Sequence, residues 1–142
     1  MPERTFLRVF AWSGALAVAL GAFGAHGLRS LVGAAEIATY ETAVRYHFYH
    51  TLAGVAGAGL MYLLGPSVRL RWACRCWLIG ILLFSGSLYL LSLREVHGLA
   101  VAFLGPITPV GGVFLIAGWV LLALGVPAVG AARTGRHGPG DS

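Results

Sequence analysis

Charged side chains are scarce in this sequence of 142 residues, of which only 11% are charged and 58% are hydrophobic. An ordinary soluble domain has about 25% charged residues. Lysine is absent, so all ten cationic residues are arginines, and the mean hydropathy is +0.80. These shortages, together with long runs that carry no charge, predict a protein embedded in a lipid bilayer rather than a soluble one.

Cysteine is also scarce, since the chain has only Cys74 and Cys76, in an arginine-rich segment. Two thiols one residue apart do not easily form a disulfide with each other, and they are too few for a four-ligand zinc site. We expect free thiols near the membrane interface and no cofactor. An alternative is a thiolate made more acidic by Arg75, but no catalytic base lies nearby in the sequence.

Four apolar segments are long enough to cross a bilayer. Gly65-Pro66 should end the second segment, because proline does not continue a helix comfortably, and Thr108 and Pro109 are good starting residues for the fourth. The first segment also resembles a secretory signal, but the rest of the chain is equally apolar. The predicted fold is an all-α integral membrane bundle of four transmembrane helices, at residues 6–25, 43–64, 76–93 and 109–129.

The remaining segments are predicted to be connectors. Residues 28–41 should form a mixed connector with a short interfacial helix, and residues 132–142 a disordered cytoplasmic tail, which leaves a single domain over residues 1–131. Positive charge is retained on the cytoplasmic side of bacterial membranes. Both termini are therefore expected in the cytoplasm, because that side receives seven arginines (4, 8, 69, 71, 75, 133 and 136) and the other side three (29, 45 and 94).

Small residues recur along the predicted spans at helical spacing. In lipid, burying apolar surface between helices gains little free energy, so glycines that let two backbones approach closely favour association. The predicted packing positions are Gly14, Gly21, Gly24, Gly54, Gly57, Gly111, Gly118 and Gly125. The expected partners of the chain are the lipid bilayer and either further copies of itself or other membrane proteins.

Polar side chains gather in the segment YETAVRYHFYHTL, which begins at Tyr40. Imidazole and phenol groups inside a membrane are costly unless they are hydrogen-bonded, so they are candidates for function. We expect a polar patch at the non-cytoplasmic end of the bundle, with Tyr46 and His50 facing the glycine-lined first helix. The candidate patch consists of His26, Tyr46, His50, Ser85 and Tyr89.

Other kinds of site are less well supported by the sequence. Haem or metal ligation by His26, His47 and His50 lacks an accompanying acidic or thiolate ligand within the spans. Ser85 lacks the carboxylate that would orient a histidine for nucleophilic catalysis, so we expect no catalytic residues. Nucleic acid is not an expected partner, because the arginines flank apolar spans instead of forming one basic face.

Four segments resemble, in order and spacing, the YgdD-like inner-membrane family, which is domain of unknown function 423 and has eukaryotic transmembrane relatives. They read LGAFGAHGL, YETAVRYHFYHTLA, LFSGSLY and ITPVGGVFLIAGW, and the resemblance extends over about residues 6–125. It implies a four-helix membrane fold with no established activity. His47 departs from the family pattern, which commonly has glutamine there. The matching positions are Gly21, Gly24, His26, Tyr46, His50, Ser85, Gly86, Tyr89, Pro109, Gly111, Gly112 and Trp119.

Three functions are compatible with these features. The first is a non-enzymatic structural or interaction module of the inner membrane, which the glycine pattern and the lack of a catalytic constellation favour. The second is a component of an oligomeric transporter or channel for protons or small solutes, with polar side chains along its path. The third is a redox protein that binds haem or a metal.

Overall fold

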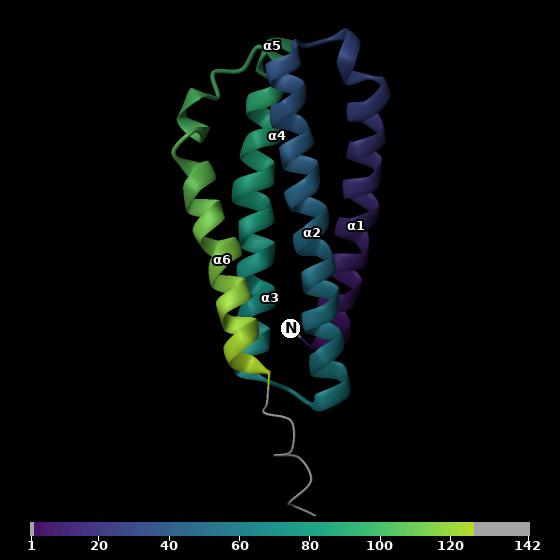
Figure 1. Cartoon of the computed structure of the whole chain (residues 1–142), viewed down its shortest axis with the longest axis vertical. Helices are drawn as coiled ribbons and strands as arrows, with labels where there is room; N and C mark the ends of the chain where they lie inside the picture. The colour runs from purple at the N-terminus through teal and green to yellow at the C-terminus, as the bar shows by residue number, and fades with distance from the viewer. Residues whose placement is uncertain (1, 127–142) are drawn as a thin grey trace, which may run out of the picture.

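The computed structural model of the protein describes residues 2–126, in which all regular structure is helical. The predicted tail at residues 132–142 lies outside this part of the chain. Four long helical rods run side by side (Figure 1). They are α1 (Glu3–His26), α2 (Ala34–Leu64), the continuous rod of α3 (Val68–Gly80), η2 (Ile81–Ser85) and α4 (Gly86–Ser92), and α6 (Ile107–Gly125). The short helices are η1 (Leu28–Ser30), α5 (Arg94–His97) and η3 (Ala102–Leu104).

Three helical stretches of the described chain are long and apolar enough to cross a membrane: Glu3–Ser30, Val68–Ser92 and Ala102–Gly125. The rod α2 has 31 residues and would be about 46 Å long, which exceeds the thickness of the hydrocarbon core. It is less apolar than the other three rods because it carries two histidines and several tyrosines. The all-helical fold is therefore confirmed, and three spans meet the usual standard of length and apolarity.

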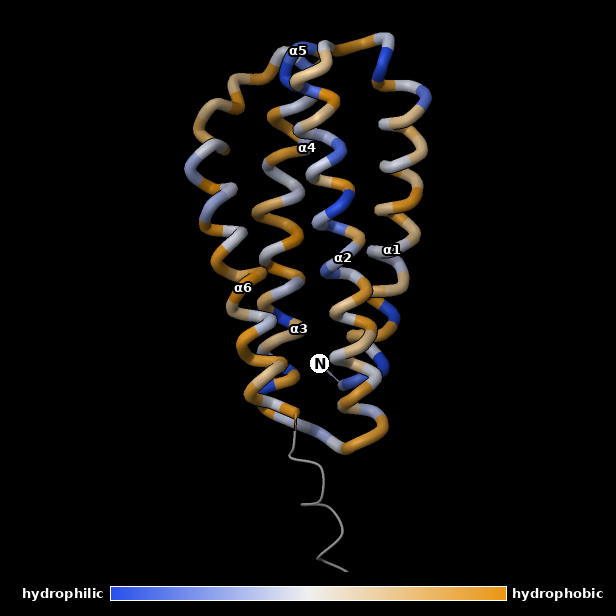
Figure 2. The backbone as a smooth tube through the Cα atoms, in the orientation of Figure 1, coloured by the Kyte–Doolittle hydropathy of each residue, from blue (hydrophilic) through white to orange (hydrophobic). Residues whose placement is uncertain are grey.

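The rods alternate in direction, so that both ends of the described chain lie at one end of the bundle (Figure 1). Hydrophilic residues concentrate near the two ends and extend furthest into the bundle along α2 (Figure 2). One ion pair lies at each end. Arg71 of α3 is 3.7 Å from Glu3 of α1 near the termini, and Arg94 of α5 is 3.5 Å from Glu36 of α2 at the other end.

The rods α2 and α3 lie in the centre, because α1 packs mainly against α2 and α6 mainly against α3, while α2 also packs against α3 and α4. All eight glycines that the sequence marks for packing lie where another helix approaches. A Cβ atom on Gly54 would overlap the ring of Phe10, and one on Gly118 would overlap the indole of Trp77. A Cβ atom on Gly24 would come within 2.7 Å of the Tyr40 ring.

The second and third rods begin earlier than the sequence indicates. The predicted connector at residues 28–41 is wrong in its second half, because Ala34 already starts α2 and Tyr40 is buried against α1. The predicted loop containing Arg69, Arg71 and Arg75 is helical as well. Ser67 caps α3 by accepting a hydrogen bond of 3.4 Å from the backbone N–H of Leu70, so the true turn is only three residues long.

The fourth rod begins earlier than predicted. Pro106 takes the N-cap position of α6, and Thr108 is inside the helix with its hydroxyl 2.6 Å from that of Ser87 in α4. The helix α6 ends at Gly125, since Val126 is extended, and the predicted end at residue 129 lies outside the described residues. Arg69 donates a hydrogen bond of 2.8 Å to the carbonyl of Leu124, which satisfies one of the unpaired carbonyls at this helix end.

One turn of the third rod, η2, is a π-helix. Such a turn holds one more residue than an α-helical turn and is frequent at functional sites. Gly111 of α6 lies against it, because a Cβ atom there would come within 2.8 Å of the backbone of Leu83 and Phe84. The widened turn and the glycine together let two helix backbones touch at this level.

Candidate functional site

A chain of polar side chains runs through the interior of the bundle around His47. Its Nε2 atom lies 2.9 Å from the hydroxyl of Ser13 on α1, and that hydroxyl lies 3.0 Å from the one of Thr51. Its Nδ1 atom lies 3.3 Å from the phenol oxygen of Tyr89 on α4. His47 is only 3% exposed, so α2 presents it to α1 and α4 and not to lipid. The chain Tyr89–His47–Ser13–Thr51 thus joins three of the four rods.

The polar chain continues toward the end of the bundle that carries α5. The ring of Tyr89 packs against that of Tyr40 with centroids 5.1 Å apart. Tyr40 itself is 1% exposed and donates a hydrogen bond of 2.9 Å to the carbonyl of Leu20 in α1. The smallness of Gly24 makes room for this ring. Tyr40 therefore fixes the spacing between α1 and α2 and packs against the ring of Tyr89.

His50 belongs to a second, separate contact. It lies about one turn from His47, yet it faces α6, where Trp119 donates a hydrogen bond of 3.1 Å from its indole N–H to Nε2 of His50. Because an indole can only donate, Nε2 must be the acceptor, and the proton sits on Nδ1. That Nδ1–H donates a hydrogen bond of 2.8 Å to the carbonyl of Tyr46. Both ring nitrogens of His50 thus have a hydrogen-bond partner while the imidazole is neutral.

The structure does not bring the five predicted patch residues together. His26 is exposed and bonds only the carbonyl of Ala22 in its own helix. Tyr46 stacks on His50 and packs against Phe84, with centroids 5.9 and 4.8 Å apart. The prediction that Tyr46 and His50 face α1 is wrong, because Tyr46 packs against Phe84 of η2 and His50 accepts a hydrogen bond from Trp119 of α6.

The last two patch residues lie on α4 and η2. Tyr89 meets His47, as described above, and not His50 or His26. Ser85 is 1% exposed, and its hydroxyl has no hydrogen-bond partner within residues 2–126. It follows that the predicted patch is divided among a cluster at His47, a pair at His50 and two isolated positions.

Sequence reasoning missed three residues that complete these contacts. Ser13 is the only hydroxyl-bearing residue between Phe6 and Ala25, and Thr51 lies one turn after His47, so both could have been found by their position. Trp119 was noted as part of the family pattern without a role. The choice of helix that each histidine faces depends on tertiary packing, and no local pattern gives it.

Most buried polar groups lie in one half of the bundle; the exceptions are Nε of Arg71 and the indole N–H of Trp77, which are buried in the other half without a partner among residues 2–126. We call residues 3–12, 53–64, 68–81 and 115–125 the terminal half, and residues 13–26, 34–52, 82–92 and 107–114 the distal half. All six buried polar side chains lie in the distal half: His47, His50, Thr51, Ser85, Ser87 and Ser92. The cluster of buried apolar side chains lies entirely in the terminal half and includes Phe6, Phe10, Met61, Leu70, Trp77 and Leu115.

Two further observations limit the chemistry of this interior. Among residues 2–126, no three His, Cys, Asp or Glu side chains are close enough together to hold a metal ion. Cys74 and Cys76 are free and buried, and the thiol of Cys74 lies 3.9 Å from the carbonyl of Gly54. The groups available inside the described bundle are therefore imidazole, phenol, hydroxyl, indole and thiol groups, which suit hydrogen bonding.

Comparison with known sequences identifies the family. A family model described as "Protein of unknown function (DUF423)" matches residues 20–112, which include α2, α3 and α4 and most of the polar cluster. The chain belongs to this family. DUF423 is the family that the four sequence motifs indicated.

Relatives of the DUF423 chain are similar over most of its length. The UPF0382 inner membrane protein YgdD of Escherichia coli K12 is 40% identical over 138 residues, which cover 97% of each chain. A UPF0382 membrane protein of Haemophilus influenzae is 42% identical over 87% of this chain and 94% of its own. A UPF0382 membrane protein of Staphylococcus saprophyticus is 37% identical over 86% of this chain and 96% of its own. No solved structure matches the chain.

Proposed function

We propose that this DUF423 protein is a non-enzymatic structural and interaction module of the inner membrane. The observation that carries the proposal is that the buried histidines of the distal half use their hydrogen bonds within the chain. The hydrogen bonds of His47 and His50 end on neighbouring side chains and backbone carbonyls of the same chain. Polar groups that bind one another fix how the rods are aligned.

The membrane arrangement is part of this proposal. All four rods cross the bilayer, with α2 crossing beside α1 and extending beyond it on the distal side. Both termini lie in the cytoplasm, which is supported by Arg4 and Arg8 at the start of α1 and by the three arginines of α3. The E. coli relative is named an inner membrane protein, which favours the same membrane here. Reporter fusions after Ala34 and after Ser142 should then report opposite sides.

A proton-handling component is the second candidate, favoured by the chain Tyr89–His47–Ser13–Thr51. Each of these groups can pass a proton to the next, since hydroxyls and a neutral imidazole both donate and accept. The apolar terminal half argues against complete transfer by one chain, because beyond Thr51 the buried residues are Phe10, Met61 and similar side chains. A conducting path would require a surface shared between several copies.

A flux measurement separates these two candidates. The purified protein would be reconstituted into liposomes that contain a pH-sensitive dye, and a pH gradient would be applied. A structural module should dissipate the gradient no faster than empty liposomes do. Faster dissipation that is lost in His47→Leu would reject the structural proposal and favour proton handling, and the protein's mass in detergent would show whether several copies take part.

A further inference from the structure

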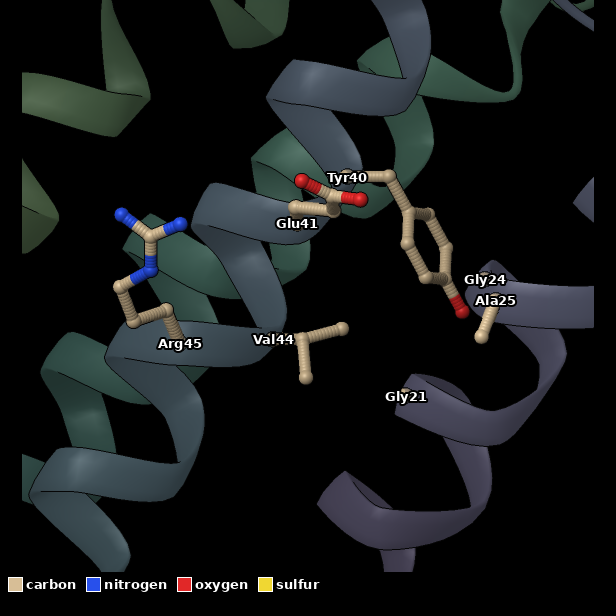
Figure 3. Close-up of a pocket in the computed structure, with 7 residues that line it drawn as sticks. All are labelled: Gly21, Gly24, Ala25, Tyr40, Glu41, Val44 and Arg45. Carbon is tan, nitrogen blue, oxygen red and sulfur yellow. The ribbon is translucent and has the colours of Figure 1, made fainter. Parts of the chain in front are cut away.

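A pocket lies between α1 and α2 at the distal end of the bundle, and it adjoins the polar chain through Tyr40. Its α1 wall consists of Gly21, Gly24 and Ala25, and Tyr40 closes its base (Figure 3). Its volume is about 260 Å³. That is several times the volume of about 30 Å³ that one water molecule occupies in the liquid, and less than most sites for whole drug-sized ligands. The pocket therefore fits a polar group of several atoms.

Two opposite charges stand at the rim of this pocket. Glu41 and Arg45 lie one turn apart on α2, and Val44 lies between Arg45 and α1 (Figure 3). The guanidinium of Arg45 is directed away from α1 in Figure 3, so it reaches the pocket only after a change of rotamer. Their spacing is that at which a helix often forms an internal ion pair. Within residues 2–126, however, the ion pairs are Arg71–Glu3 and Arg94–Glu36. Neither charge at the rim is bound to a charged neighbour in the described chain, so both are available to a ligand.

The depth of the pocket matches that of lipid headgroups. The apolar part of α1 extends from Phe6 to Ala25, a rise of about 29 Å, which is close to the thickness of the hydrocarbon core. With Phe6 at one boundary, Gly24 and Ala25 reach the other. The walls are small apolar residues, and the rim carries one positive and one negative side chain. A ligand from the membrane that carries both charges near each other complements this arrangement.

We propose that the pocket binds the headgroup of a phosphoethanolamine lipid. The guanidinium of Arg45 would contact the phosphate, since arginine suits phosphate oxygens, and the carboxylate of Glu41 would accept hydrogen bonds from the ammonium group two carbons away. Phosphatidylglycerol offers the phosphate without the ammonium. Phosphatidylcholine offers a positive charge without N–H donors. Binding itself does not depend on the proposed function, whereas the leaflet that supplies the lipid follows from the proposed orientation.

Native mass spectrometry of the detergent-purified protein tests this proposal. The protein would be mixed with equal amounts of phosphatidylethanolamine, phosphatidylglycerol and phosphatidylcholine that have the same acyl chains. We expect preferential retention of phosphatidylethanolamine. Arg45→Gln should weaken its retention by about tenfold, because it removes a charge-assisted hydrogen bond. Glu41→Gln should remove the preference over phosphatidylglycerol while leaving phosphate binding in place.

Arg29→Gln is the matched control, because Arg29 is exposed near the same end of the bundle and does not line the pocket. It should keep the preference of the parent. Both pocket charges are exposed, so their replacement should not change the helical circular dichroism. Equal retention of the three lipids by the parent, or an unchanged preference in both pocket variants, would overturn the proposal. So would an equal loss in Arg29→Gln, which would indicate general attraction by surface charge.

Discussion

The terminal and distal halves of the bundle are held together by different means. In the terminal half, aromatic rings enter spaces that glycines leave open, as Phe10 does beside Gly54 and Trp77 beside Gly118. In the distal half, hydrogen bonds between side chains connect the rods, as at His47, and His50 accepts one from Trp119 across the boundary between the halves. Close fit at glycines occurs in both halves, since Tyr40 also occupies the space beside Gly24, and the distal half adds the matching of buried donors and acceptors.

This difference reflects what a bilayer offers to a folding chain. Lipid tails are as apolar as leucine, so apolar side chains gain little by leaving them, and only close fit favours one helix arrangement over another. Polar groups have no hydrogen-bond partner among lipid tails, so they bind each other. These bonds fix the distance between two helices and the rotation of each helix about its own axis. Substitutions in the two halves should accordingly follow different rules, which the next three predictions test.

The largest effect is expected from Gly54→Leu in the terminal half. The new side chain would occupy the space of the Phe10 ring, and overpacking a close-packed core costs about 2 to 3 kcal/mol. Unfolding in detergent, followed by circular dichroism during SDS titration, measures the loss. Gly59→Leu is the control on the same helix, since a Cβ atom at Gly59 meets nothing within 4 Å. An equal loss of stability in Gly54→Leu and Gly59→Leu would show that the close contact between Gly54 and Phe10 does not determine the effect.

An intermediate effect is expected at His47 in the distal half. His47→Leu removes the partner of Ser13 and Tyr89 and should destabilise the bundle by about 1 to 2 kcal/mol. His47→Gln keeps a donor and an acceptor, so its stability should remain close to that of the parent. The same SDS titration measures both variants. A glutamine variant as unstable as the leucine variant would show that shape matters more than hydrogen bonding here.

The smallest effects distinguish two serines of the distal half. Ser13→Ala removes a hydroxyl that contacts both His47 and Thr51 and should cost about 1 kcal/mol. Ser85→Ala removes a buried hydroxyl without a partner in the described chain, so the change should be within about 0.5 kcal/mol of zero or slightly stabilising. The midpoint of thermal unfolding is sufficient to compare them. Equal losses at the two positions would contradict the assignment of Ser13 to the polar cluster.

The helical fold could be predicted from the sequence because charge and hydropathy are themselves the physical cause of membrane insertion. Helix ends were harder to predict. The arginines at 69, 71 and 75 indicated a loop, but a charged helix end can lie outside the hydrocarbon without leaving the helix. Glu36 and Tyr40 likewise belong to α2, because Arg94 and α1 provide their partners. These contacts join residues far apart in the sequence.

The polar site could be predicted only in part for the same reason. His50, Tyr46 and Tyr89 were singled out because polar groups within a membrane need partners. Which partner each one has depends on the rotation of α2 relative to α1 and α6. That rotation follows from contacts such as Tyr40 at Gly24 and Trp119 at His50, which no local pattern specifies. The glycine pattern does indicate where helices approach, since close approach is possible only where side chains are small.

The π-helical turn η2 has a consequence for how related chains can differ in length. Such a turn accommodates one extra residue without changing which neighbours the side chains before and after it contact. Trp77, before the turn, therefore contacts α6, and Tyr89, after it, contacts His47. A relative lacking one residue between Ile81 and Ser85 would form an ordinary α-helix there with both flanking faces unchanged. The same deletion elsewhere in the rod would rotate every later side chain by about 100°. This turn is thus the position in the rod that best tolerates a single-residue gap.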